Sequence, residues 1–187
     1  MASSYSADLK LELMATGEKS GLWGDITNTN LNIVQQAIAG YEEVSIAGGA
    51  QTTALVFSNG LVSNGKNAVI KFIGTITGNQ VVTIPDSIEK TYTIINGTTG
   101  AFTVEFKTVS GTGFTFAAAD KGTRLAYADG TNVVDVNAAF TTISQFTLPA
   151  ADGTSGQAIV TDGSGTLSFA QAGISTGKAI AMAIVFG

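Results

Sequence analysis

The chain has 187 residues, and only 12% of them are charged, about half of the roughly 25% that is usual in soluble proteins. It has no Cys, which excludes disulfides and thiolate catalysis, and no His, the commonest general base and metal ligand. The net charge is −5, and the 9 basic residues, of which only Arg124 is an Arg, are scattered, so we expect neither nucleic-acid binding nor docking on anionic membranes. The longest apolar run, residues 179–186, is far short of the ~20 residues that cross a bilayer, so we expect no membrane insertion.

The first zone, residues 1–43, is interpreted as an N-terminal arm and a docking helix. Apolar residues at positions i, i+3 and i+7 predict a helix over residues 25–39, and they are Leu31, Val34 and Ile38. Asp25 or Thr27 is expected to cap the start of this helix, and Gly40 stands where a C-cap glycine belongs. We expect the apolar stripe to be buried against the β domain or against a neighbouring subunit.

Trp23 is the only Trp and lies directly before the predicted helix. One interpretation is an exposed anchor for a protein partner or a sugar. The other is a hydrophobic staple that packs the start of the helix against the β domain. One residue can serve both purposes, so both interpretations stay open.

The second zone, residues 44–137, is predicted to be β throughout. Alternation is clearest over residues 102–107, where Phe102, Val104 and Phe106 share one face. Turn signals such as Asn96-Gly97 separate the strands. The predicted strands cover residues 52–57, 68–73, 80–84, 91–95, 102–108, 123–128 and 132–136. This spacing predicts a mainly β fold, an antiparallel, jelly-roll-like β-sandwich preceded by the short helix.

The third zone, residues 138–187, is rich in Gly, Thr and Ser and predicts a small β extension. Two Asp-Gly turns ten residues apart indicate a hairpin unit that is too short to form its own core. At the C-terminus large and small side chains alternate, which favours a strand, although Ala and Met also suit a helix. We interpret this segment as an assembly strand whose large side chains are Ile180, Met182, Ile184 and Phe186.

No motif supports catalysis or cofactor binding. Residues 60–67 match G-x-x-x-x-G-K, but Asn67 replaces the Ser or Thr that binds magnesium, and a β-like run follows where a helix is needed. Asp129 with Asp135, or Glu42 with Glu43, could in principle form an acid pair, but solvated turn acids are the simpler interpretation. We therefore nominate no catalytic residue, no metal ligand and no cofactor, and expect a protein without enzymatic activity.

A segment before and within the predicted helix matches the pattern T-G-E-x-x-G-x-W-G-x-x-T-N-x-N. It reads Thr16-Gly17-Glu18-Lys19-Ser20-Gly21-Leu22-Trp23-Gly24-Asp25-Ile26-Thr27-Asn28-Thr29-Asn30. The pattern resembles a recurrent segment of structural proteins of tailed bacteriophages. Pieces of the β zone such as residues 95–100 and 129–134 are similar to such proteins, and residues 148–169 resemble short repeats of phage tail-fibre shafts.

The resemblance implies a non-enzymatic virion protein, a tail-fibre-type or short appendage protein, located in the virion. It would self-associate, as a homotrimer, and dock on other virion proteins. A capsid decoration or head-fibre protein is an alternative that the resemblance leaves open. Another alternative is a receptor- or carbohydrate-binding module that contacts a host-surface glycan, which exposed loop aromatics such as Tyr127 or Tyr92 would favour. A polysaccharide-cleaving enzyme is the poorest alternative.

Overall fold

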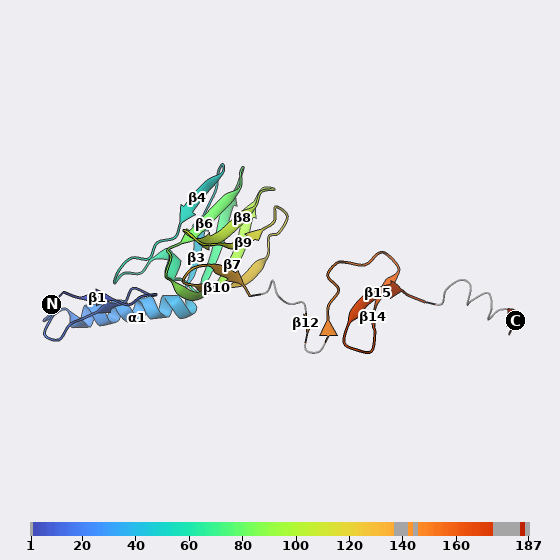
Figure 1. Ribbon diagram of the computed structural model, residues 1–187. Coiled ribbons are helices and arrows are strands. Elements are labelled where there is room, and N and C mark those ends of the chain that lie inside the picture. The colour runs from blue at the N-terminus through green and yellow to red at the C-terminus, as the bar shows by residue number, and fades with distance from the viewer. Residues whose placement is uncertain (1, 137–141, 144–145, 174–183, 186–187) are drawn as a thin grey trace. The chain divides into compact units, whose positions relative to one another are not determined.

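The chain folds into two compact units, residues 1–138 and residues 139–187. The computed structural model describes residues 2–136, 142–143, 146–173 and 184–185 (Figure 1). The first unit contains the helix and two β-sheets, and the second contains short hairpins. The prediction of a mainly β, sandwich-like fold with one N-terminal helix and a small C-terminal β extension is confirmed.

Two sheets form the body of the first unit. One has the strand order β11-β10-β7-β5-β3, and the other has the order β4-β6-β8-β9. The first sheet consists of β3 (Tyr41–Ser45), β5 (Val69–Thr75), β7 (Glu89–Thr99), β10 (Thr123–Asp129) and β11 (Val133–Asp135). The second sheet consists of β4 (Gln51–Ala54), β6 (Gln80–Ile84), β8 (Val104–Thr108) and β9 (Gly113–Phe116). The seven predicted strands are all present, β6 with its predicted bounds and the other six with shifted ends, whereas β3 and β9 were not predicted.

The chain from β3 to β8 winds as a solenoid, because successive strands alternate between the two sheets. We call this segment, from β3 to β8, the coil. Each strand therefore returns to its own sheet in the same direction, and the pairs β3–β5, β5–β7, β4–β6 and β6–β8 are all parallel. Val69 lies opposite Thr93 in one sheet and Gln80 lies opposite Val104 in the other. Asn79 and Thr103 are also 24 residues apart, and Asn79 Oδ1 accepts a hydrogen bond from Thr103 N–H at 3.2 Å.

The predicted antiparallel arrangement is wrong for this coil. Within the two sheets it holds only for the last strands, where β9 pairs with β8, β10 with β7, and β11 with β10, all antiparallel. The physical reason is that alternation and turn residues report which face of a strand is buried but not the direction of its neighbour. That direction depends on whether each connection crosses to the other sheet.

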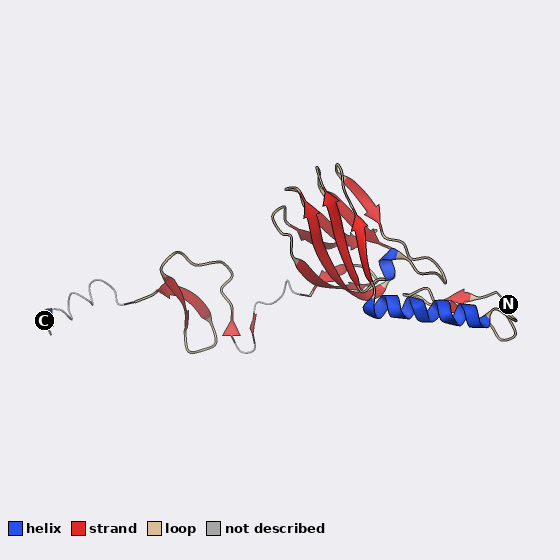
Figure 2. Ribbon diagram, turned by 180° about the vertical axis from the view of Figure 1, so that it is seen from behind, coloured by secondary structure: helices blue, strands red, loops and turns tan. Residues whose placement is uncertain are grey.

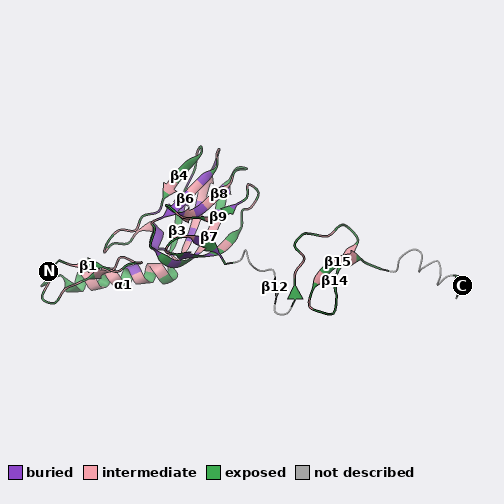
Figure 3. Cartoon of the chain, viewed as in Figure 1, coloured by how far each residue is buried: buried purple, intermediate pink, exposed green. Residues whose placement is uncertain are grey.

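The core lies between the two sheets and is rich in aromatic rings. Phe106 stands at its centre, with ring centroids at 6.0 Å from Phe72, 5.6 Å from Tyr92 and 5.9 Å from Phe114. Phe106 and Val104 are fully buried, as the alternation of residues 102–107 predicts. Figure 3 shows buried residues on the strands of the two sheets. Phe102 precedes β8 and is 36% exposed, so only the two residues within the strand follow the pattern.

The helix α1 (Trp23–Ala39) lies across one end of the two sheets (Figure 2). It begins two residues before the predicted start, so Asp25 and Thr27 lie inside it and neither caps it. Leu22 is the N-cap residue and makes no side-chain capping bond. Gly40 ends the helix as predicted, but in an extended conformation. The site requires a glycine because a Cβ there would lie 2.3 Å from Asn67 Oδ1 and 2.4 Å from the backbone oxygen of Gln36.

The N-terminal arm folds back along α1. Its two short strands, β1 (Ser4–Tyr5) and β2 (Glu12–Leu13), pair antiparallel. Asp8 Oδ1 accepts a hydrogen bond from the backbone N–H of Glu89 at 2.9 Å, and the backbone oxygen of Lys10 accepts one from Gly60 N–H at 2.7 Å. The arm therefore belongs to the first unit and connects α1 to the coil.

The second unit contains two small hairpins. β12 (Thr142–Ile143) pairs with β13 (Phe146–Thr147), and β14 (Gln157–Thr161) pairs with β15 (Leu167–Gln171). Four of the five residues of β14 are exposed, which agrees with a hairpin that has no core of its own.

The predicted C-terminal assembly strand falls largely on residues that the structure does not describe. Ile180, Met182 and Phe186 lie outside the described residues. Ile184 is 77% exposed, and Ile184 and Val185 have a helical conformation, so the predicted strand does not include these two residues. An alternation of small and large side chains is compatible with both conformations when the small residue is Ala.

Candidate functional site

The largest apolar side chains of α1 point away from the protein. We call the set Trp23, Gly24, Thr27, Leu31, Val34 and Ile38 the outer face. Trp23 is 65% exposed, Leu31 is 60% exposed and Ile38 is 74% exposed, while Val34 is half-buried. The β domain therefore does not cover Leu31 and Ile38, so the prediction that it buries the whole stripe is wrong, and burial against a neighbouring subunit stays a prediction.

The opposite side of α1 packs on the rest of the unit. Ile33 is the one residue of this fully described helix that is completely buried. Ile26, Asn30 and Ala37 follow the same side at helical spacing and are half-buried. The sequence has apolar residues on two sides of the helix. The predicted stripe is the side that stays exposed, and the side of Ile33 is the one that packs on the unit.

The N-terminal motif is built into the arm. The carboxylate of Glu18 accepts hydrogen bonds from the backbone N–H and the hydroxyl of Ser3 and from Ala15 N–H, at 3.0 to 3.2 Å. Partial desolvation opposes ionisation of Glu18, but the bonds from Ala15 and Ser3 outweigh it and lower its pKa. Gly17 and Gly21 have φ of 80° and 81°, a conformation that favours glycine.

Asn30, the last residue of the motif, fastens the arm to the helix. Its Oδ1 accepts a hydrogen bond from Glu12 N–H at 3.0 Å, and its Nδ2 donates one to the backbone oxygen of Glu12 at 2.9 Å. The polar residues and positive-φ glycines of the motif thus serve the fold of the chain itself.

No contact within the described part of the chain explains why Trp and Gly occupy positions 23 and 24, within the motif. The hydrophobic-staple interpretation of Trp23 is wrong, because Trp23 is the first residue of the helix and is 65% exposed. A Cβ added at Gly24 would meet nothing within 4 Å, and Gly24 does not have a positive φ. Gly24 is the second residue of the helix, so neither crowding by the described residues nor its backbone conformation requires a glycine there.

A cleft of about 330 Å³ lies beside the C-terminal half of α1. Its lining is mostly neutral and polar, from the helix, from the start of β3 and from the loop before β5: Asn32, Gln35, Gln36, Ala39, Gly40, Tyr41, Val62 and Asn67. Tyr41 is 53% exposed, and its hydroxyl donates a hydrogen bond to Glu43 Oε1 at 2.7 Å. Amides and one accessible ring can hold a neutral polar ligand.

The loop of residues 60–67 has no nucleotide-binding shape. A short 3₁₀ helix, η1 (Asn64–Lys66), leads directly into β5, so the helix that a phosphate-binding loop requires is missing from this fully described segment. Lys66 is fully buried, and its Nζ donates hydrogen bonds at 2.6 Å to the backbone oxygens of Ser58 and Leu61. Burial lowers the pKa of Lys66 to about 8.

Three of the four acidic residues considered as catalytic pairs, Asp129, Asp135 and Glu43, have structural partners. Asp129 Oδ1 accepts two backbone hydrogen bonds, from Thr131 and Asn132, and so closes a turn. Asp135 forms an ion pair with Arg124, and Glu43 Oε1 lies 3.0 Å from Lys71 Nζ. Within the described residues, no group of three or more Asp, Glu, His or Cys side chains is placed to hold a metal ion.

The two tyrosines considered as sugar contacts differ in exposure. Tyr92 is fully buried, and its hydroxyl donates a hydrogen bond to the backbone oxygen of Gly65 at 3.1 Å, so it cannot contact a glycan. Tyr127 is 40% exposed.

Among the described helices, none is long and apolar enough to span a bilayer.

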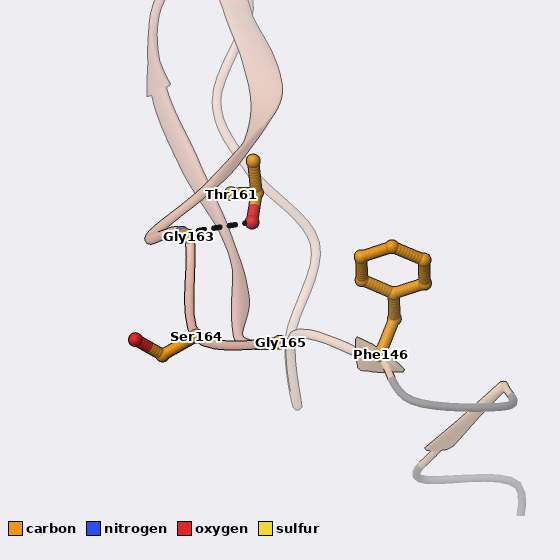
Figure 4. Close-up of a pocket in the computed structure, with 5 residues that line it drawn as sticks. All are labelled: Phe146, Thr161, Gly163, Ser164 and Gly165. Carbon is orange, nitrogen blue, oxygen red and sulfur yellow. Dashed lines mark hydrogen bonds between the residues drawn. The ribbon is translucent and has the colours of Figure 1, made fainter.

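In the second unit a cavity of about 420 Å³ lies beside the turn between β14 and β15 (Figure 4). Phe146 stands on one side of it, and the turn residues Gly163, Ser164 and Gly165 stand on the other. Thr161 Oγ1 accepts a hydrogen bond from Gly163 N–H at 3.1 Å, which holds the turn in shape. The described residues that line this cavity carry no ionisable side chain.

Comparison with known proteins adds no relative. No protein-family model, curated protein or solved structure matches the chain.

Proposed function

We propose that this protein is a non-enzymatic structural component of a bacteriophage virion, of tail-fibre or short-appendage type, that self-associates and docks on other virion proteins. The proposal is supported by the N-terminal motif, which resembles that of such proteins. The arm that this motif builds presents Trp23 to solvent.

The observation that carries the proposal is the uncovered outer face of α1. A helix that is apolar on two sides is stable in water when both sides are covered. Here the rest of the first unit covers Ile33, whereas Leu31 and Ile38 stay exposed. A protein with only 12% charged residues has few charges to keep such a face from associating, so a protein partner is the expected cover.

The test is to look for the chain in intact particles. Purified particles of the phage that encodes it are analysed by quantitative mass spectrometry and labelled with an antibody against the first unit. We expect a fixed copy number per particle and a label at one site, on the tail or on the head. Absence of the chain from intact particles, with detection only in the lysate, would contradict the proposal.

Glycan binding is a second candidate function, favoured by the amide-lined cleft beside Tyr41. Neutral amides pair with sugar hydroxyls, and an accessible ring can stack on a sugar face. Saturation-transfer NMR against host-surface oligosaccharides tests it, with Tyr41→Ala as the variant expected to lose the signal. An equal signal from both proteins would remove this candidate.

A further inference from the structure

We propose that the cleft beside the C-terminal half of α1 binds the guanidinium group of an arginine side chain that another virion protein supplies. The inference rests on the docking in the proposed function, and it names the surface and the chemistry of the partner. Three features of the cleft carry it. They are hydrogen-bond acceptors without a donor, an exposed aromatic ring, and basic residues of this chain that are bonded elsewhere.

Asn67 supplies an acceptor that is held in place. It is 3% exposed and lines the cleft. Its Nδ2 donates a hydrogen bond to the backbone oxygen of Asn64 at 3.1 Å, which fixes the amide. Its Oδ1 lies beside Gly40, where a Cβ would be 2.3 Å away, and accepts no hydrogen bond from the described residues, yet it is not sealed from solvent. A largely desolvated oxygen of this kind gains most from a donor that enters the cleft.

The C-terminal end of α1 adds further acceptors. The backbone oxygens of residues 37, 38 and 39 accept no hydrogen bond from the described residues, whereas that of Gln36 accepts two, from Gly40 and Ala68. A helix ends in a partial negative charge, and α1 has no basic residue in its last turn to offset it. Because Ala39 and Gly40 line the cleft, this charge lies at its wall and favours a cation.

Tyr41 offers a surface on which a planar cation can stack. It lines the same cleft and is 53% exposed, and its hydroxyl is held by the hydrogen bond that it donates to Glu43. A guanidinium group stacks on an aromatic face, while its five N–H donors stay in its own plane and reach acceptors at the side. An ammonium group is compact and strongly hydrated, so the cleft favours arginine over lysine.

Two lysines near the cleft do not supply the missing donor. Lys90 Nζ donates hydrogen bonds to the backbone oxygens of Asn67 and Thr91, and Lys71 Nζ donates one to Glu43 Oε1 at 3.0 Å. Neither donates to Asn67 Oδ1. Their positive charge weakens the attraction of a further cation, so we expect a single arginine side chain to bind in the millimolar range.

The arginine comes from a protein other than this one. The chain has a single Arg, Arg124, and its guanidinium forms ion pairs with Asp120 and Asp135. A second copy would have to break both pairs to offer this side chain. The net charge of −5 favours association with a positively charged surface. The expected partner is therefore a protein that exposes an arginine on a basic surface.

The test is an NMR titration of the 15N-labelled full chain with N-acetyl-arginine amide. We expect saturable shifts at Gly40, Tyr41 and the side-chain amide of Asn67. N-acetyl-citrulline amide has almost the same shape without the charge, and it should bind at least about tenfold more weakly, the factor that corresponds to 1.4 kcal/mol. N-acetyl-lysine amide should also bind more weakly than the arginine compound.

Tyr41→Leu removes the stacking surface and should weaken arginine binding at least about twofold, as the loss of an exposed cation–π contact predicts. Tyr127→Leu is the matched control, because Tyr127 is 40% exposed and lies outside the cleft, and it should leave the binding unchanged. Circular dichroism verifies that both variants are folded.

Three results would overturn the inference. The first is the absence of saturable shifts, and the second is equal binding of the arginine and citrulline compounds. The third is a shift of the cleft residues by a neutral oligosaccharide with none by arginine, which would favour glycan binding instead.

The outcome is separable from the proposed function. A chain that is present in particles but does not bind arginine would refute the site and leave the virion role standing. A chain that binds arginine through Tyr41 but is absent from particles would support the site and refute the virion role.

Discussion

Lys66 should make the protein more stable as the pH rises above 8. It is fully buried, and burial lowers its pKa from 10.5 to about 8. Between these two values the unfolded chain binds more protons at this residue than the folded chain does, so the free energy of unfolding rises with pH. One pKa unit corresponds to about 1.4 kcal/mol, which gives an upper limit of about 3 kcal/mol over the whole window.

The expected change is smaller than this limit. Lys66 Nζ donates hydrogen bonds to two backbone oxygens, and these bonds favour the charged ammonium. We therefore expect a gain of about 1 kcal/mol between about pH 7.5 and 9.5. Lys90 acts in the same direction, because its burial also lowers its pKa to about 8. The window ends near pH 10, where ionisation of Tyr92 in the unfolded chain begins to oppose the gain.

The assay is urea denaturation followed by circular dichroism at several pH values and one protein concentration, since association also shifts stability. Lys66→Met replaces the ammonium by an apolar group of similar length and should reduce the rise in stability with pH. Lys121→Met, at an exposed lysine, serves as the matched control and should keep the parent's pH profile. If Lys66→Met and the parent show parallel pH profiles, the buried amine does not control stability and the reasoning is wrong.

Three further predictions concern the packing of the first unit and its independence from the second. Phe106→Ala should destabilise the coil by about 3–5 kcal/mol, because the ring is fully buried among other aromatic rings. Phe106→Leu should destabilise it by less, and thermal melting measures both changes. Gly100→Ala should cost at least about 2 kcal/mol, because Gly100 has a φ of 103° and a Cβ there would lie 2.2 Å from the backbone oxygen of Ile76. Gly49→Ala, where a Cβ would meet nothing within 4 Å and φ is not positive, is the control and should melt like the parent. Deletion of residues 139–187 should leave the free energy of unfolding of the first unit within about 0.5 kcal/mol, because the two units are separately compact; loss of the β signal would contradict this division.

The sequence predicted the local structure well, because local structure depends on short-range patterns. The period of the apolar residues identified β6 and the buried side of β8, and it identified the helix to within two residues at its start. Gly40 marked the end of the helix, where the space beside its Cα is filled by Asn67 and the backbone of Gln36. The mismatch after Lys66 correctly predicted that residues 60–67 form a loop leading into a strand rather than a phosphate site.

The candidate site was found in part. The sequence singled out Trp23, Leu31, Val34 and Ile38, and these residues do lie together on one side of α1. It marked Gly24 only as part of the N-terminal motif, and only the structure shows that the space beside this glycine is empty. Nor could it assign Glu18 and Asn30 to the arm, since their partners are backbone groups up to 18 residues away.

Tertiary structure decided two matters that no local pattern contains. The first is strand direction. The side chains of a strand alternate in the same way whether its neighbour is parallel or antiparallel. Because each connection crosses between the two sheets, the neighbours within β3–β5–β7 and within β4–β6–β8 are parallel. The second is which side of α1 is buried. Both sides are apolar at helical spacing, and the packing of Ile33 on the unit left Leu31 and Ile38 facing water. The periodicity of a helix predicts that an apolar face will be covered, and the position of the helix against the rest of the chain determines which face is left for a partner.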